Sequence, residues 1–317
     1  MITDEALSTR VRHFRFVLAV LLIVPSSTLA SVKGKPTQLS GYKAVRVYYT
    51  PLNKMVMSVR INGRRANLLV DTGSNQIILD GLAAASFGVQ PSQGGLRYTQ
   101  QTRVNGRLLT VGFAQSLIAG GMSFGSTLVT LRESSHSDTG GTPVDGVLGL
   151  DVLTRHKAVI NCRTKLIFFK VDQARQMDLS SVAAQEKFTR IPLRREENGA
   201  LTVPCSIHGQ PARLLVDTGA FITTFHEAFV RSLGIALKAT RVSAHFARGT
   251  SRKVNSGQIS NLKIGAFQAP SAKFGVTALP NFALRQGGTR VSGILGIDTL
   301  YDYHAIIDLD GMNLFLK

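Results

Sequence analysis

The chain contains two copies of one sequence unit, and this duplication constrains its fold more than any other feature. Residues 55–73 align without a gap with residues 201–219, and both segments end in Leu-Leu-Val-Asp-Thr-Gly. Three further pairs of matching segments follow in the same order in both halves: 86–89 with 232–235, 146–153 with 293–300, and 158–170 with 305–317. The conserved order indicates two homologous units.

Within each copy the sequence predicts short β-strands joined by tight turns. Residues 55–61 alternate in polarity and lead into an Asn-Gly hairpin signal at 62–63, after which the apolar run 66–70 returns. Glycine is frequent, with 30 in the chain, and helical periodicity is scarce after residue 40. We therefore expect an all-β fold. One short helix should follow each Gly-Leu/Ile-Asp segment, with Asp151 and Asp298 as the N-caps.

The first 30 residues have the composition of a secretory signal peptide. Basic residues precede an apolar run at 16–24, and small residues typical of a cleavage site follow, ending at Ala30. The run is about half as long as a membrane-spanning helix, so we expect cleavage and export to the periplasm or envelope, with an uncleaved anchor as the alternative. The remaining chain divides into a first lobe (38–171), a polar, helix-forming linker (172–187) and a second lobe (188–317).

Each copy resembles a retropepsin-type aspartic protease unit. The shared marks are an apolar strand that ends in Asp-Thr-Gly, at 71–73 and 217–219, and a later Gly-x-Asp-x-Leu segment, at 149–153 and 296–300. The chain after residue 30 resembles the two-domain, single-chain bacterial members of this family. The resemblance implies two homologous closed β-barrel lobes of the acid-protease type, with the active site between them.

The resemblance also identifies Asp71 and Asp217 as a catalytic pair for peptide hydrolysis. Hydrolysis without a metal or covalent nucleophile needs one group to deprotonate water and another to protonate the carbonyl oxygen. Two adjacent carboxyls that share one proton can do both, because two like charges so close together do not both ionise. By resemblance, supporting roles fall to residues of the two loops and to glycines behind them: Thr72, Gly73, Ser74, Thr218, Gly219, Gly149 and Gly296.

The two loops differ in the residue that follows the shared tripeptide. Ser74 could donate a hydrogen bond to its neighbouring aspartate, whereas Ala220 has no hydroxyl group. We therefore expect an asymmetric pair in which Asp71 carries more of the negative charge and Asp217 more of the proton. The ion-pairing residues of the retroviral dimer interface are also missing from this chain. The contact between the lobes must therefore use other residues.

Two glycine-containing turns occupy corresponding places between the Asp-Thr-Gly loop and the second glycine motif of each half. By resemblance they are candidates for flaps, the hairpins that close over substrate, and ordinary surface hairpins are the alternative. The candidate residues are Val104, Asn105 and Gly106 in the first half and Arg248, Gly249 and Thr250 in the second.

Other motifs carry less weight. A third Asp-Thr-Gly, at 138–140, follows a polar stretch and has no counterpart in the repeat, so we interpret it as a surface turn. Residues 121–125 fit Gly-x-Ser-x-Gly, but β-type residues follow where that nucleophile motif needs a helix. His226 and Glu227 begin like a zinc-protease motif, yet Val230 stands in place of the second histidine. We expect neither a metal nor a cofactor.

Cys162 and Cys205 are the two cysteines of the chain. In an oxidising compartment they could form a disulfide that joins the end of the first half to the start of the second. Spacing alone does not establish the geometry that a disulfide needs, so two unpaired, half-buried thiols remain the alternative.

The chain is strongly basic, with 37 Lys and Arg against 19 Asp and Glu and a net charge of +18. Such a charge favours anionic envelope surfaces or acidic substrates. The basic residues are scattered and no nucleic-acid module is recognisable, so we do not expect nucleic acid as a partner. We expect an extended polypeptide substrate and a monomer whose halves form an intramolecular pseudo-dimer. A catalytically inactive peptide-binding module or an envelope adaptor on the same fold is the alternative.

Overall fold

Both copies of the repeat fold into the same antiparallel hairpin. In the computed structural model, β3 (Met55–Ile61) pairs with β4 (Arg64–Val70), and β16 (Leu201–Ile207) pairs with β17 (Gln210–Val216). Each hairpin turns through two residues with positive φ, 49° and 82° at residues 62–63 and 51° and 80° at residues 208–209. This backbone is the one that suits a two-residue hairpin, and the predicted turn is confirmed.

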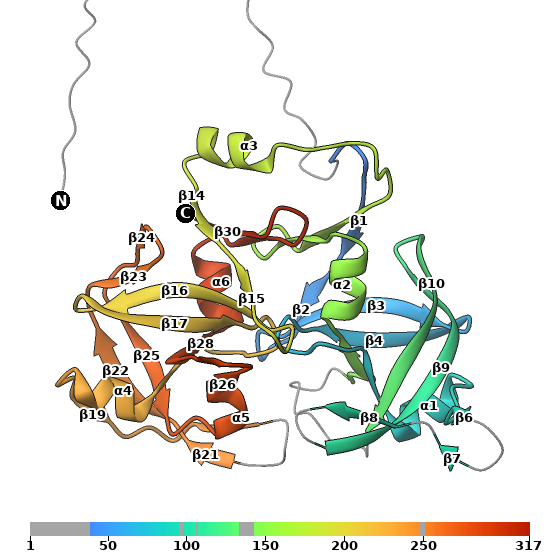
Figure 1. Cartoon of the computed structure of the whole chain (residues 1–317), viewed down its shortest axis with the longest axis horizontal. Coiled ribbons are helices and arrows are strands. Elements are labelled where there is room, and N and C mark those ends of the chain that lie inside the picture. The colour runs from blue at the N-terminus through green and yellow to red at the C-terminus, as the bar shows by residue number, and fades with distance from the viewer. Residues whose placement is uncertain (1–38, 95–97, 100, 105–106, 133–142, 247–250) are drawn as a thin grey trace, which may run out of the picture. The chain divides into compact units, whose positions relative to one another are not determined.

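The structure describes residues 39–94, 98–99, 101–104, 107–132, 143–246 and 251–317 (Figure 1). All of them belong to one unit that begins at Pro36. No helix among these residues is long and apolar enough to span a membrane.

The first lobe is a closed β-barrel. Its strands pair in the order β2-β3-β4-β11-β5-β10-β9-β8, and β9 also pairs with β3, which closes the ring. Its further strands are β2 (Tyr48–Tyr49), β5 (Ile78–Asp80), β8 (Gln101–Val104), β9 (Arg107–Ala119), β10 (Met122–Arg132) and β11 (Gly146–Leu148), with β6 (Gln93–Gly94) and β7 (Tyr98–Thr99) paired separately. Its helices are α1 (Gly81–Ser86) and α2 (Leu150–Arg155).

The second lobe repeats most of this strand order in an open, curled sheet. Two strands, β22 (Asn255–Ile259) and β23 (Leu262–Ile264), take the place of the long β9. They lie towards opposite ends of the order β19-β22-β25-β18-β28-β17-β16-β23-β24 and are joined at 260–261, but no pairing among the described strands closes this sheet, which curls into a half-barrel. The other strands of this order are β18 (Thr224–His226), β19 (Leu237–Lys238), β24 (Phe267–Gln268), β25 (Ala272–Thr277) and β28 (Gly293–Leu295).

Smaller elements complete the second lobe. They are β15 (Arg194–Arg195), β20 (Ser243–His245), β21 (Ser251–Lys253), β26 (Arg285–Gln286), β27 (Thr289–Arg290), α4 (Glu227–Ser232), α5 (Asn281–Leu284) and α6 (Ile297–Asp302). Helices α2 and α6 stand where the sequence predicted short helices, and the predicted all-β fold is confirmed.

A further sheet is built from both halves of the chain. Its order is β1-β13-β12-β29-β30-β14, and its strands are β1 (Tyr42–Arg46), β13 (Leu166–Lys170), β12 (Val159–Asn161), β29 (Ile306–Asp308), β30 (Asn313–Leu316) and β14 (Thr189–Pro192). The halves meet where β12 and β29 run antiparallel, with Ile160 opposite Ile307. Helix α3 (Leu179–Gln185) packs against this sheet and connects the halves.

Candidate active site

The two Asp-Thr-Gly loops follow the buried strands β4 and β17. Each of these strands lies parallel to a second strand, β11 in the first lobe and β28 in the second. Asp71 donates its main-chain N–H to Leu148 O at 3.1 Å, and Asp217 does the same to Leu295 O at 3.0 Å. The parallel neighbour therefore fixes the point at which each loop leaves its sheet.

The threonines of the two loops tie the lobes together. The main-chain N–H of Thr72 donates to Thr218 Oγ1 at 3.0 Å, and the reciprocal bond measures 3.1 Å. Each hydroxyl group then donates to the strand behind the opposite loop, Thr72 Oγ1 to Val216 O and Thr218 Oγ1 to Val70 O, both at 2.8 Å. Both threonines are fully buried, so these four bonds are shielded from water and hold the loops in register.

The loop glycines let each carboxyl lie against the opposite loop. A β-carbon on Gly73 would stand 2.5 Å from Asp217 Cγ, and one on Gly219 would stand 2.5 Å from Asp71 Cγ, which is too close for any side chain. The N–H groups of these glycines donate to the aspartates of their own loops, each at 2.8 Å. As a result the carboxyls of Asp71 and Asp217 lie within hydrogen-bonding contact of each other.

The geometry suits a pair that holds one proton. Burial raises the pKa of Asp71, and the charge of Asp217 and the hydrogen bond between the carboxyls raise it further. Burial also raises the pKa of Asp217, but the hydrogen bond from Asp71 and the main-chain N–H groups of Gly219, Ala220 and Gly73 oppose that rise. Because Asp217 has more donors around it, Asp217 is the better site for the negative charge and Asp71 for the proton.

This bias is opposite to the one that we predicted from Ser74, because the hydroxyl bond to Asp71 on which that prediction was based does not form. Ser74 Oγ donates to the main-chain oxygen of Gln76 at 3.0 Å, and a hydroxyl group has one proton to give. Ser74 supports Asp71 through its main-chain N–H instead, which lowers the pKa of that carboxyl. The loop conformation, which no local sequence pattern reveals, decides this outcome.

Gly149 and Gly296 pack directly behind the loops. A β-carbon on Gly149 would lie 2.4 Å from Gln76 O, and one on Gly296 would lie 2.5 Å from the carbonyl carbon of Ile222. These glycines, and not the aspartates that we predicted, are the N-caps of α2 and α6.

Asp151 and Asp298 lie inside the first turn of those helices and bind the loops from behind. Asp151 Oδ2 accepts from Ile77 N at 3.1 Å, and Asp298 Oδ1 accepts from both the N–H and the hydroxyl group of Thr223, each at 2.8 Å. Sequence reasoning missed this role. The available signal was the presence of the same Asp at the same place in both halves.

A polar contact between the lobes lies beside the first loop. The side-chain amide of Asn75 donates to the main-chain oxygen of Asn198, which lies between β15 and β16. Asn198 Nδ2 donates to Gln286 Oε1 at 2.8 Å, and Gln286 Nε2 donates to Ala283 O at 3.0 Å. Phe221 holds the place of Asn75 in the second half, so this amide contact belongs to one side only.

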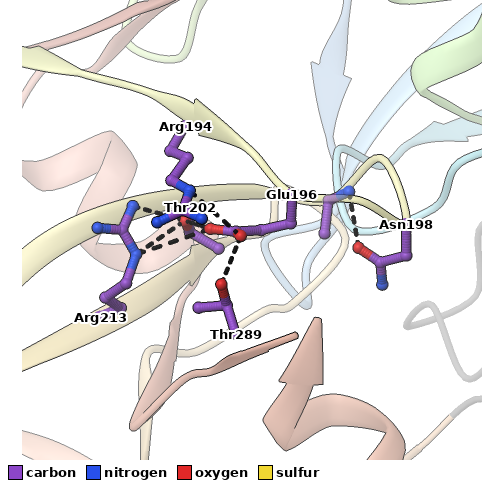
Figure 2. A network of polar contacts seen from close by, with 7 residues as sticks. Arg194, Glu196, Asn198, Thr202, Arg213 and Thr289 are labelled. Carbon is purple, nitrogen blue, oxygen red and sulfur yellow. Dashed lines mark hydrogen bonds and ion pairs between the residues drawn. The ribbon is translucent and has the colours of Figure 1, made fainter. Parts of the chain in front are cut away.

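Figure 2 shows how the turn that carries this contact is anchored. Glu196 is 5% exposed, and its carboxylate accepts from Thr202 Oγ1 at 2.5 Å and from Thr289 Oγ1 at 2.6 Å. Arg194 Nε and Arg213 Nε lie 3.4 and 3.7 Å from its oxygens. Burial on its own would raise the pKa of Glu196, but these partners outweigh it and hold the pKa below its ordinary value. The turn is therefore fixed by a charged group that is fully partnered.

The two carboxyls open into a cleft of about 250 Å³ that is lined by residues of both halves. Most of its wall is apolar: Ile78, Val147, Leu215, Ala220, Phe221, Ile222, Ala244, Phe246, Phe282, Ala283 and Ile294. In the described part of this wall, the ionisable side chains besides the two aspartates are Arg132 and His245. Among the residues that the structure describes, no group of three or more His, Cys, Asp or Glu side chains could hold a metal ion.

The flap candidates fall mostly outside the described residues. Val104 ends β8, which forms a hairpin with β9. The flanking strands of the second candidate, β20 and β21, also form a hairpin, and Ala244, His245 and Phe246 from its first side line the cleft. Asn105, Gly106, Arg248, Gly249 and Thr250 lie outside the described residues, so the flap assignment stays a prediction.

The disulfide that the two cysteines could form is absent, and the alternative of free thiols holds. Cys162 follows β12 in the sheet shared by both halves, where its N–H donates to Ala305 O at 3.0 Å. Cys205 lies on β16 of the second lobe, opposite Ala212 and Ile264. Both thiols are buried, and burial raises the pKa of each to about 12, which keeps them protonated and unreactive.

A comparison with protein families agrees with this site. The family model described as aspartyl protease matches residues 57–152 and 203–299, once in each half. The chain therefore belongs to the aspartyl protease family, and the resemblance drawn from its sequence is confirmed. A search of curated protein sequences gave no match.

Three of the solved structures that match this chain are described here by their identity, coverage and TM-score. Basic 7S globulin from soybean has 11% identity and a TM-score of 0.49, covering 86% of this chain and 93% of its own. An aspartic proteinase from Irpex lacteus has 14% identity and a TM-score of 0.48, covering 87% of this chain and 96% of its own. The protein edgp has 11% identity and a TM-score of 0.48, covering 87% of this chain and 94% of its own.

Proposed function

We propose that this chain is an aspartic endopeptidase that hydrolyses peptide bonds with a water molecule activated by Asp71 and Asp217. The observation that carries the proposal is the hydrogen-bonding contact between these two carboxyls, one from each half, in a largely apolar cleft. A pair that holds one proton supplies a general base and a general acid at the same place.

The protons can be followed through both steps. The ionised carboxylate of Asp217 takes a proton from water as the water oxygen bonds to the scissile carbonyl carbon, while Asp71 gives its proton to the carbonyl oxygen. A neutral tetrahedral diol results. Asp217 then gives its proton to the leaving nitrogen, and Asp71 takes one from a hydroxyl group of the diol as the C–N bond breaks. The pair returns to its starting state, with one proton on Asp71.

The substrate would lie extended in the cleft, with its side chains against the apolar wall and its backbone beside the β8–β9 and β20–β21 hairpins. Such a chain presents unpaired N–H and C=O groups that a hairpin edge can bind. A catalytically inactive relative that only binds peptides would use the same cleft. Cleavage therefore has to be measured separately from binding.

The test is incubation of the protein, without residues 1–30, with a denatured protein substrate at acidic to neutral pH. We expect Asp71→Asn and Asp217→Asn to lose at least about a hundredfold in activity, and a pepstatin-type inhibitor to block the unaltered protein. Asp138→Asn, in the third Asp-Thr-Gly, is the matched control and should cleave normally. Normal cleavage by Asp71→Asn would exclude the proposed mechanism, and binding without cleavage by the unaltered protein would favour the inactive module.

We also propose that residues 1–30 direct export and are then removed, which would place the protease in the periplasm or at the envelope as a monomer. The basic n-region and the short apolar run support this. N-terminal sequencing of the protein from an envelope fraction should give a chain that begins just after Ala30. A chain that retains its first residues would mean an anchor instead.

A further inference from the structure

The wall of the cleft is asymmetric in charge. Arg132, the last residue of β10, lies opposite Asp80 at the end of β5. The corresponding strand ends of the second half carry Thr277 opposite His226, and neither of these residues is part of the described wall. Arg132 therefore places a guanidinium group, paired with Asp80, on the first-lobe side of the cleft, and the described part of the second-lobe wall has no arginine or lysine.

The guanidinium group of Arg132 is held in one orientation. Its Nε donates to Asp80 Oδ1 at 2.7 Å, with the two side chains 24% and 13% exposed, and the N–H of Asp80 in turn donates to Asp145 O at 3.0 Å. Nε is one of five N–H donors of a guanidinium group. The two terminal nitrogens have no hydrogen-bond partner among the residues that the structure describes. Arg132 lines the cleft and Asp80 does not, so a ligand in the cleft would meet the cation and not its partner.

Apolar side chains lie next to this cation in the same wall. Ile78 stands opposite Thr130, two residues before the Asp80–Arg132 pair, and side chains two apart on a strand share one face of the sheet. Val147, on the neighbouring β11, is opposite Ile78. Together they offer two apolar surfaces and a fixed cationic end. A carboxylate on a short methylene chain matches that combination.

We propose that Arg132 makes the first-lobe side of the cleft a subsite for an acidic side chain, so that the enzyme prefers substrates with glutamate or aspartate at one position beside the scissile bond. This inference rests on the proposed peptidase function and adds the substrate class. The reactive pair carries one negative charge, which repels an acidic side chain nearby. Asp80 balances the charge of Arg132, but hydrogen bonds from the terminal nitrogens of Arg132 would offset that repulsion. Because the second half has no such cation in the described wall, the acidic residue should be accepted on one side of the bond only.

The test uses pairs of quenched fluorescent peptides that differ only by Glu or Gln, placed in turn at each of about three positions on either side of the scissile bond. We expect kcat/KM to favour Glu by about tenfold at a single position, as a bond between charged groups would give. Arg132→Gln should remove this preference, so that kcat/KM for the Glu peptide falls to that for the Gln peptide. Arg132→Lys, which keeps the charge but not the planar fork, should retain a reduced preference.

Arg46→Gln is the matched control, because Arg46 is an exposed arginine on β1, outside the wall of the cleft. It makes the same change of net charge and should keep the preference for Glu. Equal cleavage of Glu and Gln peptides at every position, or a preference that persists in Arg132→Gln, would overturn the inference while leaving the peptidase function intact. Failure to cleave any peptide would instead overturn the peptidase function and the inference with it.

Discussion

Asp71 and Asp217 keep their carboxyls in contact at a place where charge is poorly solvated. The buried threonine bonds hold the loops together and impose this arrangement. Burial raises the pKa of both carboxyls, so the folded chain retains a proton at pH values at which the unfolded chain has released it. Such raised values are common at reactive sites and reduce the stability of the fold near neutral pH.

Replacing one member of the pair should therefore stabilise the protein. We expect Asp217→Asn to raise the free energy of unfolding at pH 7 by about 1 kcal/mol, because it removes a buried charge. The native protein binds more protons than the unfolded chain here, so its own stability rises as the pH falls through the raised pKa towards the ordinary value near 3.8. The difference in the free energy of unfolding between the variant and the native protein should therefore become smaller as the pH falls.

Urea denaturation of both proteins at neutral and mildly acidic pH measures this difference. The carboxyls other than Asp71, whose pKa depends on Asp217, are the same in both proteins, so their contributions cancel in the comparison. Asp217→Asn could prove less stable than the native protein at pH 7, or the difference in the free energy of unfolding could grow in acid. Either result would show that burial does not strain the pair.

The single-residue roles divide into those that local sequence could predict and those that it could not. The Asp-Thr-Gly loops were recognisable because the same six residues recur after an apolar strand in each half. The direction of the Ser74 hydroxyl and the positions of Asp151 and Asp298 were not. Each depends on which main-chain group lies opposite a side chain after folding, and the partner of Asp151 is Ile77, 74 residues earlier.

The turn between β15 and β16 links the lobes beside Asp71 and Asp217. It receives the amide of Asn75, and the buried carboxylate of Glu196 anchors it. The hairpins themselves followed from alternating polarity and turn residues. The contact did not, because Asn75 and Asn198 are 123 residues apart and neither belongs to a recognisable motif.

Asn75→Ala should loosen the first loop without unfolding the protein. Loss of one hydrogen bond should lower the free energy of unfolding by about 1 kcal/mol. Because Asn75 lies two residues after the first Asp-Thr-Gly, we also expect kcat/KM to fall by about tenfold if Asp71 is catalytic as proposed. Gln258→Ala is the matched control, since it removes an exposed amide bond to Ser271 of 2.8 Å in the second lobe. Equal kcat/KM for the two variants would argue against a positioning role for Asn75.

For the molecule as a whole, the two lobes are not independent bodies. Their last strands combine in the sheet in which β12 meets β29, and one continuous core of buried side chains includes residues of both lobes. The duplication predicted two lobes, but the matching segments 158–170 and 305–317 looked like an ordinary final strand of each lobe. Nothing in the sequence of either half indicates that β12 will pair with β29, its equivalent in the other half.

The shared sheet should make unfolding a single transition. Ile307, at the centre of β29, is fully buried opposite Ile160, and Ile307→Ala should cost about 2–5 kcal/mol. Probes placed in either lobe should report the same shifted midpoint. Val182→Ala on α3, where the side chain is 52% exposed, should change little. Two separate transitions in the unaltered protein would contradict this coupling.

In the proposed mechanism two carboxyls, one from each half, share a proton and activate water together. The most direct measurement is the pH dependence of kcat/KM for one peptide substrate. We expect a bell-shaped curve: activity falls in acid as the pair takes up a second proton, and falls again at higher pH as the shared proton leaves. That second fall should lie above the ordinary range of an aspartate, because burial and Asp217 raise the pKa of Asp71. Activity that rises through a single ionisation and then stays constant up to alkaline pH would contradict it.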